Sequence, residues 1–255
     1  MSTLGAGLRA QLLTLSRSPN SFLTLITMPL STVVLLATVR HAGRSDLVGH
    51  ALVAPVLMAQ WAMALLVAGE LVETERAEET LDLLVASPTS FPVLLAGRIA
   101  AVTMVGAVAF AEGWAVATFG FGVDVTIQHP LAFAIAALAT AFAVAGWATV
   151  LSAGLVLAGP VRFLQNTLTF PVYVLSGVLV PVALLPGPLR PLSRVLFLSW
   201  SADLLRDAYG APNVSALPGR VGVVLGLGIV GFALGNGLLG LALHSLRASG
   251  RLGLT

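Results

Sequence analysis

The acidic side chains of this 255-residue chain are concentrated in one stretch whose spacing suits contact with another protein. Six of the 11 acidic residues lie between residues 70 and 98, in the run ELVETERAEETLDLLVASPTSFPVLLAGR. Leu81, Leu84 and Val85 give this run an apolar edge that can fill a groove, while the surrounding carboxylates can set the register of binding. The alternative, which composition alone favours, is a solvated helix whose charges only keep it out of lipid.

Chemistry within the chain itself is restricted by what the sequence lacks. It has no cysteine and all 13 of its basic residues are arginine, so thiolate sites, Schiff bases and a GxxxxGK phosphate loop are excluded. There is also no HExxH, no GxSG and no pair of intramembrane aspartates, which leaves a membrane-embedded enzyme without a nucleophile or a metal site. His41, His50 and His129 lack the spacing of metal ligands. We therefore predict no enzyme activity and no cofactor in this chain.

The composition indicates that the chain lies in a membrane. Hydrophobic residues make up 57% and charged residues 9%, with a mean hydropathy of +0.97, whereas a soluble domain is about a quarter charged. Six continuous apolar runs are each long enough to cross a bilayer as a helix, and none alternates as a barrel strand does. The six predicted spans are residues 21–39, 51–69, 99–122, 130–161, 163–180 and 221–243. The small excess of 13 basic over 11 acidic residues does not suggest nucleic acid.

The segments outside these spans complete a single all-α membrane domain over residues 1–255. Residues 1–20 carry leucines at helical spacing before Ser18-Pro19-Asn20, which predicts an amphipathic helix on the membrane surface rather than a signal peptide. Residues 70–88 are expected to continue as a helix beyond the second span until Ser87-Pro88 ends it. Residues 181–220 form the long connection between the fifth and sixth spans.

Arginine placement weakly favours both termini on the cytoplasmic side. That orientation puts seven arginines inside and six outside, but the inside ones lie close to span ends, where the charge bias has most effect. The six outside arginines are then Arg40, Arg44, Arg190, Arg194, Arg206 and Arg220.

Glu112 is the one ionisable residue well inside a predicted span. It lies about 14 residues beyond Arg98, or about 21 Å along a helix, and an intramembrane carboxylate is a functional candidate by default. The alternative is a protonated or paired carboxyl, or one that reaches water. The residues that can line a pathway are Gln60, Glu112, Gln165, Asn166 and Tyr173. A second set predicts close helix packing in the last span: Gly222, Gly226, Gly231 and Gly235.

The order of these features resembles the type-2 ABC transporter permease family. Glu79-Thr80-Leu81-Asp82 is similar to the family's Gly-Thr-Leu-Glu tetrapeptide, with Glu79 in place of the glycine, and Ser87-Pro88 and Arg98 follow as they do in the family. The run LSGVLVPVALLPGPLRPLSRVLFLSWSADLLRDAYG resembles the family's fifth span, its return into the outer leaflet and its external amphipathic turn. The residues that carry this second likeness are Ser176, Gly177, Pro181, Pro186, Asp203 and Arg206.

The resemblance implies a permease subunit of a bacterial exporter in the cytoplasmic (inner) membrane. Such a permease pairs with a second permease, identical or paralogous, and two separate ABC ATP-binding subunits hold the ATP and magnesium. The region around residues 70–88 would be the cytoplasmic coupling helix, and residues 181–220 would hold an outer re-entrant or amphipathic segment. The residues expected to dock the ATPase are Glu73, Glu78, Glu79, Thr80, Leu81, Asp82, Leu84, Ser87 and Pro88. The substrate would be an amphipathic or hydrophobic drug, natural product, lipid or peptide. An ion-coupled secondary transporter that uses Glu112 is the alternative.

Overall fold

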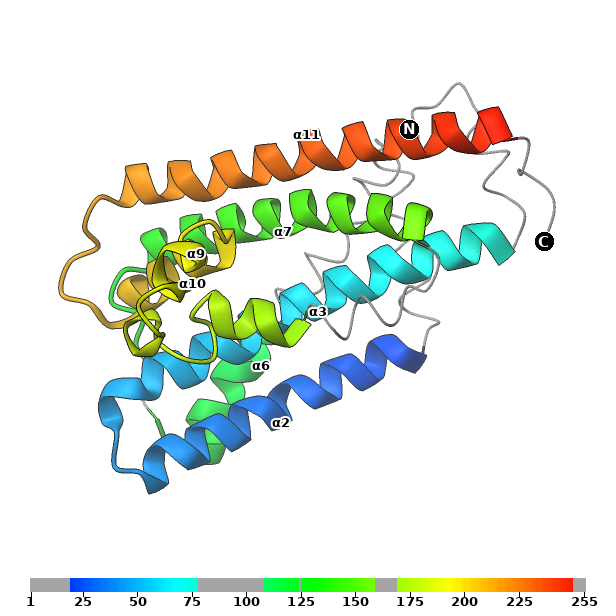
Figure 1. The fold of residues 1–255 in the computed structure, drawn as a ribbon. Coiled ribbons are helices and arrows are strands. Elements are labelled where there is room, and N and C mark those ends of the chain that lie inside the picture. Colours follow the sequence, from blue (N-terminus) through cyan, green and yellow to red (C-terminus); the bar gives the residue numbers. More distant parts are fainter. Residues whose placement is uncertain (1–18, 78–107, 124, 159–168, 250–255) are drawn as a thin grey trace.

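Helices form all the regular structure in the part of the chain that the computed structural model describes, residues 19–77, 108–123, 125–158 and 169–249. Four of the six helices are long and two are shorter (Figure 1). They are α2 (Pro19–His41), α3 (Val48–Ala77), α6 (Val108–Ala115), α7 (Pro130–Ala158), α10 (Phe197–Gly210) and α11 (Leu217–Ser249). Residues 169–175 are also helical. The remaining turns are the 3-10 turns Ser45–Leu47 and Val182–Leu184, the π turn Val116–Gly120 and the short helix α9, Leu189–Ser193.

Three of the long helices contain segments with the length and composition of membrane spans. Among the described residues, Ser45–Leu65, Pro130–Gly154 and Leu217–Leu241 are long and apolar enough to cross a membrane. Continuous apolar sequence forms helices there because a helix satisfies every backbone hydrogen bond within the segment. The predicted all-helical class is therefore observed in the described residues, and the count of six spans stays a prediction.

Two helix boundaries differ from those of the predicted segments. α2 begins at Pro19, so the last two residues of the predicted surface helix 1–20 belong to α2; proline suits the first turn of a helix. The predicted fifth span reaches Val180, whereas the helix that begins at residue 169 ends at Leu175. Gly177 has a φ of +72°, a left-handed conformation that breaks a helix. The rest of the predicted surface helix lies outside the described residues.

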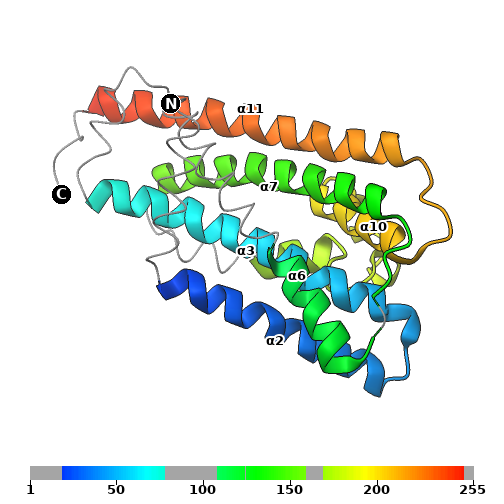
Figure 2. The same ribbon diagram turned by 180° about the vertical axis from the view of Figure 1, so that it is seen from behind.

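α3 is the central helix of the bundle. It packs against α2, α6, α7 and α10, and almost all side chains between residues 51 and 65 are buried. It also runs without interruption to Ala77, eight residues beyond the predicted end of the second span. Seen from behind, α6 lies against α2 and α3, on the face of α3 opposite residues 169–175 (Figure 2).

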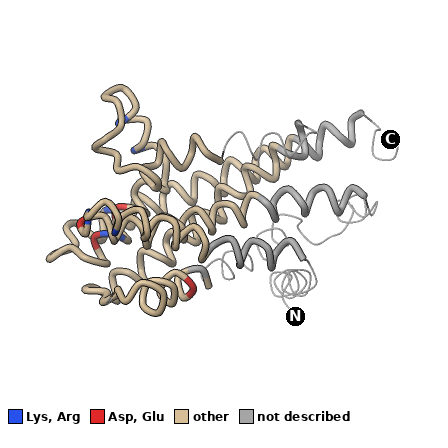
Figure 3. The backbone as a smooth tube through the Cα atoms, turned by 90° about the horizontal axis from the view of Figure 1, so that it is seen from below, with Lys and Arg blue, Asp and Glu red and all other residues tan. Residues whose placement is uncertain are grey.

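The connections 42–47, 121–123, 125–129 and 176–216 meet at one end of the bundle, which we call the α10 end (Figure 1). Among residues whose side chains are described, the arginines and aspartates gather toward this end (Figure 3). The six arginines predicted to lie outside therefore share one end of the structure.

Candidate functional site at the α10 end

α10 is a short amphipathic helix buried in the bundle by its apolar side. Its 14 residues place leucine, alanine and phenylalanine side chains against α3, α7 and α11. The buried residues are Phe197, Leu198, Ser199, Ser201, Ala202, Leu204, Leu205 and Ala208. The sequence predicted an amphipathic element in residues 181–220, and α10 is the helix that has this character.

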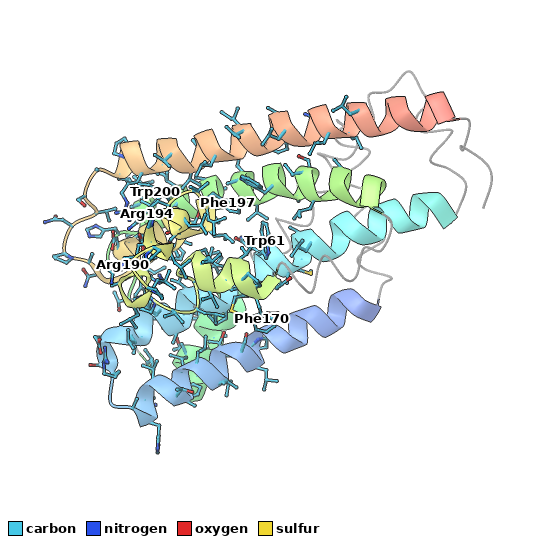
Figure 4. All side chains as sticks on the ribbon, in the orientation of Figure 1. Trp61, Phe170, Arg190, Arg194, Phe197 and Trp200 are labelled. Atoms are coloured by element: carbon cyan, nitrogen blue, oxygen red, sulfur yellow. The ribbon has the colours of Figure 1, made fainter. Side chains whose placement is uncertain are left out.

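Aromatic rings join α10 to two of its neighbours. The ring of Phe197 lies 5.9 Å from that of Trp61 on α3 and stacks at 6.5 Å on that of Trp147 on α7 (Figure 4). The indole N–H groups of both tryptophans are buried and donate to no acceptor in the described part of the chain. Buried hydrogen-bond donors without partners can bind a polar group of a ligand within an otherwise apolar core.

Arg206 connects α10 to the bend at the end of the fifth span. Its Nη2 donates to the carbonyl oxygens of Gly177 at 3.0 Å and Val178 at 2.8 Å. Burial lowers the pKa of this guanidinium to about 10, partly offset by the nearby charges of Asp203 and Asp207, so it stays charged at neutral pH. Backbone N–H groups of the bend bond to the last carbonyls of the helix that ends at Leu175, and Arg206 satisfies two carbonyls that follow it.

Two ion pairs hold the polar side of α10. Asp203 accepts from Arg194 at 2.7 Å, and Asp207 accepts from Arg220, at the start of α11, at 2.6 Å. Arg194 also lies over the ring of Trp200, whose indole N–H donates to the Arg194 carbonyl at 2.9 Å (Figure 4). Arg194, Asp207 and Arg220 were not among the predicted site residues. Their signal in the sequence is that a chain with so few charges places four arginines and two aspartates between residues 190 and 220.

The C-terminal turn of α10 is bonded to the start of α7. The backbone N–H groups of Gln128 and His129 donate to the carbonyls of Tyr209 and Ala208 at 3.1 and 3.0 Å. Nε2 of His129 lies 3.0 Å from the Ala211 carbonyl. α10 thus bonds to the ends of the fifth span, α7 and α11.

Three of the five predicted pathway residues, Gln60, Glu112 and Tyr173, lie in the described part of the chain. Tyr173 is 3% exposed and donates its hydroxyl to the Met58 carbonyl at 2.7 Å, two residues along α3 from Gln60. Gln60 is 1% exposed, and its Oε1 has no partner among the described residues. Glu112 lies on α6, on the other face of α3, with one carboxylate oxygen buried and similarly without a partner. Gln165 and Asn166 lie outside the described residues.

The predicted docking segment is described only at its start. Glu73 falls in the last turns of α3, which continues the second span through Ala77. The other predicted docking residues, Glu78, Glu79, Thr80, Leu81, Asp82, Leu84, Ser87 and Pro88, lie outside the described residues. Their role stays a prediction.

The four predicted packing glycines divide between two faces of α11. A Cβ atom at Gly231 would lie 2.8 Å from the Gly146 backbone of α7, and one at Gly235 would lie 2.2 Å from Oγ1 of Thr149. Gly222 and Gly226 have nothing within 4 Å of such a Cβ. A Cβ atom at Gly228, which was not among the predicted packing glycines, would lie 2.9 Å from the Cα of Ala143. A period of four residues alone could not show which glycines face α7.

Comparison with protein families gives a match to one of them over most of the chain. The family described as ABC-2 type transporter matches residues 3–209, which include every described helix except α11 and the last residue of α10. A comparison with curated proteins finds no match. No three His, Cys, Asp or Glu side chains of the described residues come together as a metal site requires.

Proposed function

Because the chain belongs to the ABC-2 type transporter family, we propose that it is the permease subunit of an ATP-driven exporter in a bacterial cytoplasmic membrane. It works with two ATP-binding subunits and a second permease. ATP and magnesium bind to the partner, since a chain without lysine has no GxxxxGK loop. Both termini face the cytoplasm, and the α10 end faces outward.

The observation that carries this proposal is the construction of the α10 end. An amphipathic helix closes one end of an apolar bundle and is held there by polar contacts with the fifth span, α7 and α11. Polar contacts can exchange partners, so they can break and form again. The element that closes a transport pathway must be able to do this. The six described arginines at this end are the ones that this orientation places outside.

The core beneath α10 supports an amphipathic substrate. Three side chains have a buried polar atom with no hydrogen-bond partner among the described residues: Gln60, Trp61 and Trp147. Leucine, valine and alanine side chains surround them. A substrate with a large apolar body and one or two polar groups satisfies both kinds of surface. A drug, natural product, lipid or peptide of this kind fits the proposal.

Coupling to the ATPase is assigned to the segment that continues α3, residues 70–88. A helix that extends a span without a break transmits a movement at its cytoplasmic end as a rigid body. Leu81 and Leu84 supply the apolar contact, and the neighbouring carboxylates set its register.

A pull-down of the tagged full-length chain from native membranes in mild detergent tests the proposal. Mass spectrometry should identify an ATP-binding subunit in stoichiometric amount with the wild type. Leu81→Asp or Leu84→Asp should lower its recovery about tenfold, because a buried charge removes about 1.4 kcal/mol or more of binding energy. Membrane insertion should be unchanged.

Leu184→Asp is the matched control, since Leu184 is 73% exposed at the α10 end, whereas α3 ends with Ala77 at the opposite end of the bundle (Figure 1). It should retain the subunit fully. Recovery of no ATPase after crosslinking would contradict the proposal. Uptake driven by a proton gradient without ATP, and lost in Glu112→Gln, would establish the ion-coupled alternative instead.

A further inference from the structure

A cavity of about 260 Å³ lies between α3, α6, the connection 125–127, Phe133 of α7 and Tyr209 of α10. Its floor is formed by Leu52, Val53 and Val56 of α3, each at most 8% exposed. None of the described residues assigned above to docking, pathway or packing lines it.

The lining selects an uncharged ligand. Its described residues include no ionisable acid or base other than the phenol of Tyr209, and apart from the indole of Trp114 every other described lining side chain is hydrocarbon or hydrogen. The cavity exceeds the engineered space of about 150 Å³ that holds a benzene molecule in an apolar protein core. Several methylene groups of a chain can therefore occupy it.

Two of the residues that line the cavity lie at the surface of α6. Ala111 is exposed and Trp114 is 47% exposed at the rim, with the Trp114 ring edge-on to Phe119 at 6.0 Å. Phe119 itself is 80% exposed. In a membrane protein such an apolar, aromatic surface faces lipid, so the bilayer is what lies at the mouth of the cavity.

The depth of the cavity matches the acyl region of one leaflet. Its floor residue Val56 lies eight residues after the start of α3 at Val48, or about 12 Å along the helix axis from the α10 end. The hydrocarbon core of a bilayer is about 30 Å thick, so this level is within the leaflet at the α10 end.

We propose that the cavity is a lipid site that holds one acyl chain of a bilayer lipid from the leaflet at the α10 end. The chain enters between Ala111 and Trp114, lies on the α3 floor and reaches Tyr209. Since Tyr209 belongs to α10 and its carbonyl accepts from Gln128, the bound chain also braces α10 against α7. This inference depends on membership of a membrane-protein family and not on the direction of transport or the ATPase partner.

A photoreactive lipid tests the site in the full-length chain. The protein is reconstituted into phosphatidylcholine vesicles that contain a small fraction of phosphatidylcholine with a diazirine at the end of one acyl chain. After irradiation, mass spectrometry should place saturable crosslinks on residues 52–56 and 110–114. Unlabelled lipid that carries the same acyl chain should compete for these crosslinks.

Ala111→Phe should fill the mouth of the cavity and lower these crosslinks at least fivefold. Ala134→Phe, on an exposed position of α7 outside the cavity, is the matched control and should leave them unchanged. If Ala111→Phe does not accumulate, Ala111→Leu gives the same comparison with a smaller side chain. Crosslinks spread evenly over exposed positions such as Leu138 and Ile229, or unaffected by either substitution at Ala111, would overturn the proposal. Crosslinks displaced by an exported substrate would show a substrate site and would overturn it as well.

Discussion

The contact between α7 and α11 and the attachment of α10 hold the same bundle together by opposite means. α7 and α11 pack more extensively than any other described pair of helices, through glycines that let their backbones approach. α10 is held at its polar side by arginines, aspartates and backbone hydrogen bonds. A contact made by backbone fit has one arrangement, whereas polar contacts can exchange partners at small cost. The difference predicts that α7 and α11 form the fixed part of the bundle and that α10 is the part that can move.

The fixed part has little space to adjust. Oγ1 of Thr149 donates to the Gly146 carbonyl at 2.6 Å, so this hydroxyl is already used within α7 where α11 crosses it. The atoms nearest to Gly231 are backbone atoms, which cannot rotate away as the end of a side chain can. Close approach of this kind is a main source of helix association in lipid.

The largest effect is expected for Gly235→Leu. A Cβ there would lie 2.2 Å from Oγ1 of Thr149 and 2.7 Å from the Thr149 backbone, so α11 must move away from α7. Overpacking costs about 1–3 kcal/mol where side chains can adjust, and more where backbone resists. The melting temperature of the detergent-purified protein should fall by about 6 °C or more, measured by a thermal-shift assay.

Gly222→Leu is the control for that substitution on the same helix. A Cβ at Gly222 meets nothing within 4 Å, so this change should shift the melting temperature by no more than about 2 °C. Equal losses in both variants would mean that the outward face of α11 is also covered, and the distinction between fixed and movable parts would fail.

The glycines of α11 show what the sequence could and could not provide. Apolar runs predicted helices because hydrocarbon leaves the backbone no other way to satisfy its hydrogen bonds, and α2, α3, α7 and α11 are found where four of these runs were placed. Small residues at intervals of four indicated close packing, but Gly222 and Gly231 are equivalent in such a pattern. Only the position of α7 separates them, and a single sequence contains no information on which helix is the neighbour.

An intermediate effect is expected for Arg206→Met, which breaks the connection of α10 to the fifth span. A hydrogen bond to a charged group contributes about 1.5–3 kcal/mol, but methionine also removes the cost of burying the charge. The net loss in the free energy that holds the bend closed is therefore about 1.4 kcal/mol. The measurement uses the absence of native cysteine: Val178→Cys introduces a single thiol at a position that is 0% exposed. A water-soluble maleimide should label it about tenfold faster in the Arg206→Met background, because opening of the bend becomes easier.

Arg190→Met provides the matched control for this labelling. Arg190 also donates to two backbone carbonyls, those of Leu185 and Ala183 at 3.0 and 2.9 Å, but it is exposed and lies outside the contact with the fifth span (Figure 4). Labelling at position 178 should be unchanged. If Arg190→Met accelerates it as much as Arg206→Met does, the segment 181–196 loosens as a whole and Arg206 has no particular part in holding the bend.

The polar attachment of α10 was predicted only in outline. Asp203 and Arg206 were noted for their likeness to a family pattern, but a helical spacing of three residues would pair them with each other. In the structure Asp203 bonds to Arg194, while Arg206 reaches carbonyls 28 and 29 residues earlier. Pairing of this kind depends on the bend at Gly177 and on the depth of α10, which follow from tertiary packing rather than from local sequence.

The smallest effect is expected for Asp203→Asn, at the more exposed of the two ion pairs on α10. Side-chain exposures of 46% for Arg194 and 30% for Asp203 place this pair where water and salt screen it, so its loss should cost at most about 1 kcal/mol. Asp207→Asn should cost more, because its partner Arg220 is only 16% exposed. Melting temperatures at low and high sodium chloride check both: the difference between wild type and Asp203→Asn should shrink with salt, while that for Asp207→Asn should persist. If the order is reversed, Asp203 acts mainly through its charge on the buried Arg206, and the movable part of the bundle is governed by that one cation rather than by the ion pairs around it.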